Sequence, residues 1–281
     1  MTTLNTQRTF GVEFEGYGID RHELARKLRE AGLQAQEASY SGSNYSIWQV
    51  KYDGSINGPQ GFEIVSPVLQ GAEGIEQVKT ALRVVRENGG DANRSCGFHI
   101  HWGVSNWGIK QFRNFFKRWG KFEKGIDLVQ PKSRRDDNAH YCRSILHDVC
   151  PSHIGGDIKT ITEQFFSAID SCRSVAQIEG LTQAGYDGRY RKLNMKKYHR
   201  TGTIEVRHGS GTFDEQKALA WIALTGSMIA DADNGKAIKG WNSSVDAKKV
   251  LDTLLGAAVR VGGIDTATRA FFKKRVKQLA R

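Results

Sequence analysis

The chain has 281 residues, of which 39% are hydrophobic and 10% aromatic, so it is long and apolar enough to bury a full core and is not disordered. Lys and Arg number 41 against 30 Asp and Glu, and this net charge of +11 favours an anionic partner, whether a nucleotide phosphate or an anionic polymer. No apolar run approaches the roughly 20 residues that span a bilayer, and the start of the chain is too polar for a secretory signal, so we expect a cytoplasmic protein without membrane insertion.

The first predicted strand, residues 9–16, carries two glutamates on one face. Successive side chains of a strand point to opposite faces, so the alternating Phe and Val residues point toward a core. Glu13 and Glu15 then point the other way, about 7 Å apart. Two carboxylates this close repel each other, so a cation must lie between them or one of them must hold a proton.

Further patterns in the first hundred residues predict alternating strands and helices. Asp20 with Glu23 is typical of a capping box, and it opens a helix that closes near Gly32. The other expected elements are strands at 45–52 and 61–65, a turn at Asp53-Gly54, a helix at 73–88 and a strand at 96–103. In the last strand His99 and His101 share the face opposite the apolar residues.

The second half is predicted to be mainly helical. A helix at 108–126 carries a stripe of aromatic residues, which we interpret as core. Residues 129–160 lack periodicity, and two interpretations stay open for them: a loop that covers a site, or a disordered insertion. The other expected elements are short helices at 160–170 and 174–180, strands at 190–196 and 203–208, a helix opened by Thr212 with Glu215 and running to 232, a linker at 234–243, and helices at 246–260 and 266–280.

Four of these strands place polar side chains opposite apolar ones. For each strand alone, a solvated polar face of an antiparallel sheet is the simpler interpretation. Taken together, four carboxylates, two imidazoles and a guanidinium favour a site for Mg²⁺ or Mn²⁺ over zinc, because hard cations prefer oxygen ligands. An arginine beside metal-binding carboxylates suits a phosphate or carboxylate. The side chains concerned are Glu13, Glu15, Glu63, His99, His101, Glu205 and Arg207.

Short motifs follow one another in a fixed order along the chain. They are Gly11-Val12-Glu13-Phe14-Glu15, Asp53-Gly54-Ser55, Gly61-Phe62-Glu63-Ile64-Val65-Ser66-Pro67, Cys96-Gly97-Phe98-His99-Ile100-His101, and Thr203-Ile204-Glu205-Val206-Arg207 with Gly211-Thr212. In order and spacing the chain resembles, from about residue 9 to 230, the amidoligases. That family belongs to the carboxylate–amine ligase superfamily, with glutamine synthetase and glutamate–cysteine ligase.

The resemblance implies a fold of the α+β class. It implies a curved antiparallel β-sheet with helices packed on its convex face, like the catalytic domain of glutamine synthetase. The catalytic domain would cover residues 8–232, and residues 244–281 would form a basic helical extension packed on the same domain. The chain is much shorter than glutamine synthetase, so the substrate-contacting additions of that enzyme are not carried over.

The resemblance also implies an activity: an ATP-dependent amide ligase that joins a small-molecule or peptide carboxylate to an amine through an acyl phosphate, at a site with several Mg²⁺ or Mn²⁺ ions. By motif position, the implied metal ligands are Glu13, Glu15, Glu63, His99 and Glu205. The implied catalytic residues are His101 near the ATP phosphates, Arg207 at the transferred phosphate or substrate carboxylate, and Asp53 as a further ligand or at the amine. The implied nucleotide-phosphate contacts include Arg191, Lys192 and Asn194.

Alternatives from other classes stay open. The basic stretches at 189–197 and 273–281 suit a nucleic-acid-binding protein, or a ligase whose acceptor is borne on a polymer, although nucleic-acid binding does not explain the ordered acidic motifs. A thiol hydrolase built on Cys96 and His99 is disfavoured, because residues three apart on a strand project to opposite faces. A catalytically silent family member is disfavoured because the acidic and histidine positions are all present.

Overall fold

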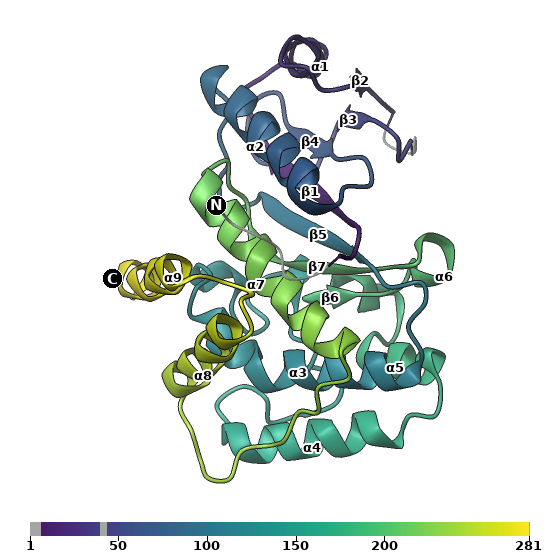
Figure 1. Cartoon of the computed structure of the whole chain (residues 1–281), viewed down its shortest axis with the longest axis vertical. Coiled ribbons are helices and arrows are strands. Elements are labelled where there is room, and N and C mark those ends of the chain that lie inside the picture. Colours follow the sequence, from purple (N-terminus) through teal and green to yellow (C-terminus); the bar gives the residue numbers. More distant parts are fainter. Residues whose placement is uncertain (1–6, 40–43, 281) are drawn as a thin grey trace. The chain divides into compact units, whose positions relative to one another are not determined.

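The computed structural model describes residues 7–39 and 44–280. Within these ranges the protein is mixed α/β, with helices and a mostly antiparallel open sheet of seven strands, whose hydrogen-bonded neighbours run in the order β2-β3-β4-β1-β5-β7-β6 (Figure 1). The strands are β1 (Phe10–Gly16), β2 (Ala35–Glu37), β3 (Trp48–Lys51), β4 (Phe62–Val65), β5 (Gly97–Gly103), β6 (Leu193–Asn194) and β7 (Thr203–Ser210). The helices are α1 (Arg21–Glu30), α2 (Gly71–Glu87), α3 (Ile109–Asp127), α4 (Ile158–Ser171), α5 (Val175–Thr182), α6 (Tyr198–Thr201), α7 (Glu215–Asp233), α8 (Ala247–Arg260) and α9 (Thr266–Leu279).

The chain forms two compact units. The first consists of Gln7–Gly103 and His208–Ile222, and the second of Val104–Arg207 together with the chain from Ala223 onward. Both β7 and α7 begin in one unit and end in the other. The domain boundaries predicted from the resemblance, 8–232 and 244–281, follow a different division and stay predictions.

In the first unit, β1 lies between β4 and β5 and is antiparallel to both. The alternation in sequence sends the apolar side chains of β1 and β5 to one face, where Phe14 stacks on Phe98 with ring centroids 4.5 Å apart and Phe10 contacts Trp102. Burial of these large rings fixes the register, because a slip by one residue would turn them to the other face. The glutamates of β1 and the histidines of β5 are therefore held together on the opposite face.

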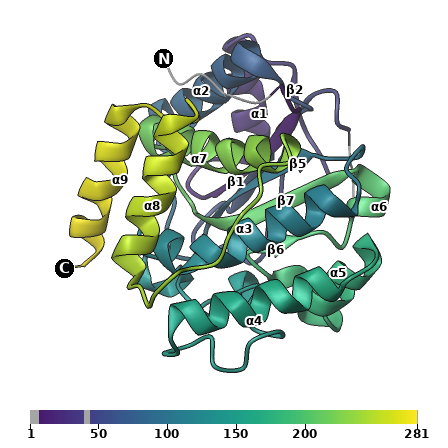
Figure 2. The ribbon, with the colours of Figure 1, turned by 60° about the horizontal axis from the view of Figure 1, so that its bottom comes forward.

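In the second unit, α3 is the central helix, and α4, α5 and α8 pack against it (Figure 2). The aromatic stripe of α3 is buried, as its periodicity predicts. A Cβ atom on Gly125 would lie 2.5 Å from the backbone nitrogen of Leu251, so the glycine permits the close approach of α8. β6 pairs antiparallel with β7, which places Asn194 opposite Glu205.

Several elements differ from the predictions. β2 pairs with β3 in parallel, so the sheet is not wholly antiparallel as expected. The strand expected at 190–196 is limited to two residues, and β2 and α6 were not predicted. Helix α7 is capped by Asp214, whose carboxylate accepts from the Lys217 backbone nitrogen at 2.7 Å, and not by Thr212. Short elements carry too few residues for a period to emerge, and this accounts for most of these differences.

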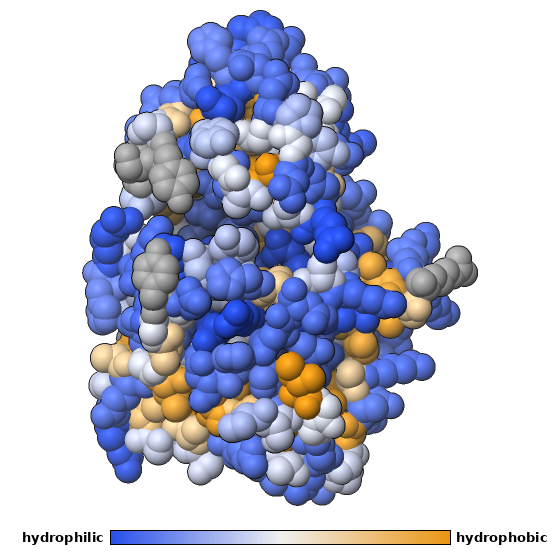
Figure 3. All heavy atoms as spheres, turned by 180° about the vertical axis from the view of Figure 1, so that it is seen from behind, coloured by the Kyte–Doolittle hydropathy of each residue, from blue (hydrophilic) through white to orange (hydrophobic). Residues whose placement is uncertain are grey.

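Hydrophilic side chains cover most of the face shown in Figure 3, with smaller groups of hydrophobic ones between them. Among the helices of residues 7–39 and 44–280, none combines the length and the hydropathy required to cross a bilayer.

Candidate active site

Five side chains from three neighbouring strands of the first unit share one face, and we call them the strand cluster. They are Glu13 and Glu15 on β1, Glu63 on β4, and His99 and His101 on β5. The register places Glu15 directly opposite Glu63, and Glu13 directly opposite His99. Cβ atoms of directly opposed residues lie about 4.5–5.5 Å apart, so side chains separated by up to 88 positions in the sequence meet here.

The imidazole of His99 lies between the two glutamates of β1. Its Nδ1 is 3.2 Å from Glu13 Oε2, and its Nε2 is 3.6 Å from Glu15 Oε1. His101 Nε2 is 3.0 Å from Glu13 Oε1. Glu15 is fixed further by the Gly97 backbone nitrogen, which donates to its Oε2 at 2.5 Å. The ligand atoms of Glu15, Glu63 and His99 can all lie within 4.8 Å of one another.

Two carboxyl groups of the strand cluster have pKa values shifted in opposite directions. Burial raises the pKa of Glu63 well above its usual value, and the negative charges of Glu13, Glu15 and Asp53 raise it further. Burial also acts to raise the pKa of Glu13, but the charges and hydrogen bonds of His101 and His99 outweigh it and hold this pKa well below the usual range. Burial and like charge therefore disfavour ionisation of Glu63, and a divalent cation bound beside it would relieve that penalty.

Two side chains lie at the edge of the strand cluster. Asp53 follows β3 in the predicted turn, where its Oδ1 accepts from the backbone nitrogen and hydroxyl of Ser55 at 2.8 and 2.7 Å. Lys51 is buried opposite Glu63, and its charge acts to lower the pKa of that carboxyl. Lys51 was missed by the sequence interpretation, although its position in the strand expected at 45–52 could have indicated it.

In the second unit, Asn194, Glu205 and Arg207 form a group of polar side chains that we call the β7 group. Asn194 Nδ2 donates to Glu205 Oε2 at 2.7 Å, and the Arg207 guanidinium lies 2.5 Å from Glu205 Oε1. Arg207 also donates from Nε to the Tyr141 carbonyl at 3.4 Å. Each carboxylate oxygen of Glu205 therefore has a fixed donor, which holds the side chain in one orientation.

The two other predicted phosphate contacts are ion-paired and buried. Lys192 Nζ lies 2.6 Å from Asp127 and 3.4 Å from Glu123, both on α3. Burial acts to lower the pKa of Lys192, but the charges of Asp127 and Glu123 outweigh it and raise that pKa. Arg191 lies 2.6 Å from Asp148. The nucleotide role of both cations stays a prediction.

A mostly antiparallel sheet that gathers buried and half-buried carboxylates and imidazoles on one face defines a candidate enzyme site. A family model described as "Putative amidoligase enzyme" matches residues 6–229, which include the strand cluster and the β7 group. The chain belongs to this amidoligase family, and the family description indicates ligase activity. The resemblance drawn from the motifs is thereby confirmed. No curated protein matches the chain at a significant level.

Proposed function

We propose that the protein is an ATP-dependent carboxylate–amine ligase, which forms an amide bond through an acyl phosphate. The observation that carries this proposal is the strand cluster, in which Glu13, Glu15, Glu63 and His99 converge from three strands in a member of the amidoligase family. Curvature of the sheet like that of glutamine synthetase is part of the proposal.

The donor set of the strand cluster fits Mg²⁺, or alternatively Mn²⁺. Three carboxylates and one imidazole are mainly oxygen ligands, and the raised pKa of Glu63 reflects burial and uncompensated negative charge. By motif position the family resemblance adds Glu205 as a ligand. When bound, such ions neutralise the phosphate oxygens of ATP.

In the proposed reaction, a substrate carboxylate oxygen attacks the γ-phosphorus of ATP, and ADP leaves. The amine then attacks the acyl carbon, inorganic phosphate leaves, and the amine nitrogen gives up a proton. Phosphoryl transfer depends on positioning and on charge neutralisation. We assign His101 to the ATP phosphates, Arg207 to the transferred phosphate or the substrate carboxylate, and Asp53 to a metal ion or to the amine.

We propose small-molecule or peptide carboxylates and amines as substrates. The net charge of +11 keeps an anionic polymer open as the bearer of the acceptor. The segment between α3 and α4 is proposed to cover the acyl phosphate against water.

The test is hydroxamate formation from a panel of carboxylates with ATP, Mg²⁺ and hydroxylamine as a generic amine. We expect at least one carboxylate to give a hydroxamate, and Glu15→Gln to abolish its formation while the fold is kept. Glu73→Gln, an exposed glutamate in the first turn of α2, is the matched control and should retain activity. Unchanged hydroxamate formation in Glu15→Gln would remove the strand cluster from the reaction.

Arg207 provides a second test. We expect Arg207→Ala to lower the rate of hydroxamate formation far more than nucleotide affinity, because the guanidinium is assigned to charge that is being transferred. Affinity for a non-hydrolysable ATP analogue and single-turnover rates separate the two effects. Equal loss of both would indicate a purely binding role.

A further inference from the structure

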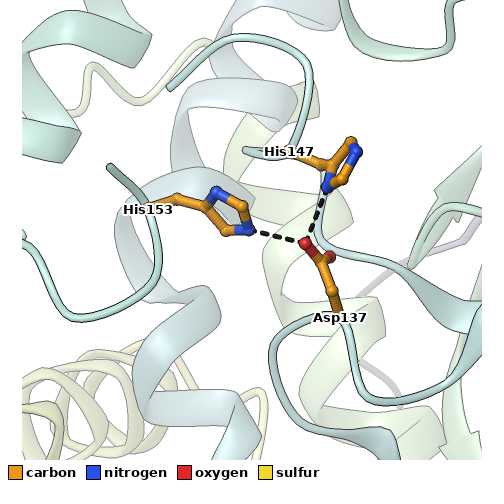
Figure 4. Close-up of side chains that lie close together, drawn as sticks. All are labelled: Asp137, His147 and His153. Carbon is orange, nitrogen blue, oxygen red and sulfur yellow. Dashed lines mark hydrogen bonds and ion pairs between the residues drawn. The ribbon is translucent and has the colours of Figure 1, made fainter. Parts of the chain in front are cut away.

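A second cluster of ligand-type side chains lies in the segment between α3 and α4, which the sequence interpretation left as irregular. Asp137 Oδ2 is 2.6 Å from His147 Nδ1 and 2.9 Å from His153 Nε2. Figure 4 shows both imidazole rings pointing a nitrogen at this one carboxylate from separate parts of the segment. The three side chains play no part in the proposed ligase reaction.

The hydrogen bond of His153 Nδ1 determines whether Nε2 of the same ring donates or accepts. Nδ1 lies 3.0 Å from the carbonyl oxygen of Cys150, and a carbonyl only accepts, so Nδ1 carries a hydrogen. In a neutral ring Nε2 then presents a lone pair, and it faces a carboxylate oxygen that is also an acceptor. A proton or a metal ion must therefore lie between them.

The surroundings of the cluster match those of a metal site. Histidines that bind a metal through one nitrogen usually donate the other N–H to a carboxylate or a backbone carbonyl, as His153 does to Cys150. The other oxygen of Asp137 accepts from the Ser144 backbone nitrogen at 2.9 Å, which orients the carboxylate. The neighbouring residues are anchored to α3, because Glu123 accepts from the Ser144 hydroxyl and from the Ile145 backbone nitrogen.

We infer that Asp137, His147 and His153 bind a zinc-type transition ion through Oδ2, Nδ1 and Nε2, with a water molecule as fourth ligand. Two imidazoles and one carboxylate suit zinc, whereas the carboxylate-rich strand cluster suits Mg²⁺. Ligands of a tetrahedral zinc ion lie roughly 3.4 Å apart, so the nitrogens must withdraw from Oδ2 by less than about 1 Å. His147 has room to do so, since 36% of its side chain is exposed, against 6% for His153. The ion would cross-link the segment between α3 and α4.

The first experiment measures binding of Zn²⁺ alone to the full chain after treatment with a chelator. The background is Glu15→Gln with Glu63→Gln, so that the strand cluster does not contribute. We expect one zinc ion per chain. His147→Ala should weaken its binding by more than about 100-fold, because even changes to outer-shell partners cost about 10–100-fold. His140→Ala is the matched control, an exposed histidine of the same segment, and should bind zinc normally.

The second experiment needs no substitution in the segment. Co²⁺ added to the same background should give the visible bands of a four- or five-coordinate ion with nitrogen and oxygen ligands, without thiolate-to-cobalt charge transfer. Thiolate bands would assign the metal to a cysteine, such as Cys142 or Cys150 of the same segment, and overturn the inference. Absence of zinc binding, or an equal loss of zinc affinity in His147→Ala and His140→Ala, would also overturn the inference. A proton would then be the cation between Asp137 and His153. None of these results bears on the proposed ligase activity.

Discussion

At the scale of single residues, Glu63 shows that the strand cluster lowers the stability of the fold in order to provide a binding site. Its carboxyl is opposite Glu15, near Glu13, and the residue is half-buried. Without a cation, ionisation of Glu63 opposes folding, because both burial and like charge favour the protonated form. The strand cluster therefore concentrates unfavourable electrostatic interactions, as binding and catalytic sites commonly do.

This gives a prediction for Glu63→Gln. Near neutral pH and with a chelator present, we expect the variant to melt at the same temperature as the unaltered protein or higher, because glutamine carries no charge that burial or the neighbouring glutamates can disfavour. We expect hydroxamate formation to be abolished in the same variant. Differential scanning calorimetry and the hydroxamate assay check the two parts. A clearly lower melting temperature in chelator would mean that the Glu63 charge is compensated by the protein itself.

A second residue-scale prediction concerns Cys150. Burial raises the pKa of its thiol from 9.0 to about 11, so the folded state disfavours the thiolate. The associated stability is fully present below the unfolded pKa of 9.0 and is lost as pH rises through the folded pKa. Near neutral pH we expect alkylation of Cys150 to be at least about 100-fold slower in the folded protein than in urea, from the two-unit difference in pKa. Peptide mass mapping measures the alkylation of Cys150. Equal rates in the folded protein and in urea would contradict the burial of this thiol.

At the scale of elements, the alternation of apolar and polar residues along the strands provided most of what could be predicted from the sequence. The face shared by Glu13 and Glu15, and that shared by His99 and His101, followed from period two alone, and the capping of α1 by Asp20 followed from its spacing to Glu23. Burial of Lys192 could not be read from the sequence, since its partners lie 65 and 69 positions away on α3. The cluster of Asp137 with two histidines was missed because no period relates residues in an irregular segment.

Lys192 distinguishes a structural role from a nucleotide contact. In this structure it neutralises Glu123 and Asp127, and the Lys192 side chain is fully buried. Lys192→Met should therefore lower the free energy of unfolding by about 3–5 kcal/mol, because it leaves two buried carboxylates without their cation. Urea unfolding measures this, with Lys196→Met, a more exposed lysine, as control. Normal stability with weakened ATP binding would support the nucleotide role instead.

Gly209 tests the packing within the first unit. A Cβ atom there would lie 2.5 Å from the Phe98 carbonyl oxygen and 2.9 Å from the Trp221 ring nitrogen. Gly209→Ala should destabilise the protein by about 1–3 kcal/mol, because backbone must shift to admit the methyl group. Gly240→Ala, where an added Cβ atom would meet nothing within 4 Å, is the control and should be close to neutral. Equal stability of the two variants would mean that β7 does not approach β5 this closely.

At the scale of the whole molecule, the family match ends at residue 229, inside α7, and leaves α8 and α9 outside it. Helix α8 nevertheless packs on α3, with Val250, Leu251, Leu254 and Leu255 buried. The sequence left open whether the last helices belong to the core or dock a partner, and the burial of α8 favours the core. A helix outside the family pattern is therefore part of the second unit.

The ligase proposal is tested most directly by following oxygen from the substrate. A carboxylate that yields a hydroxamate is labelled with ¹⁸O and incubated with the protein, ATP, Mg²⁺ and an amine, and the released phosphate is analysed by mass spectrometry. An acyl phosphate predicts that one ¹⁸O atom passes from the carboxylate to inorganic phosphate. Unlabelled phosphate, or ¹⁸O found in AMP, would contradict the proposed chemistry.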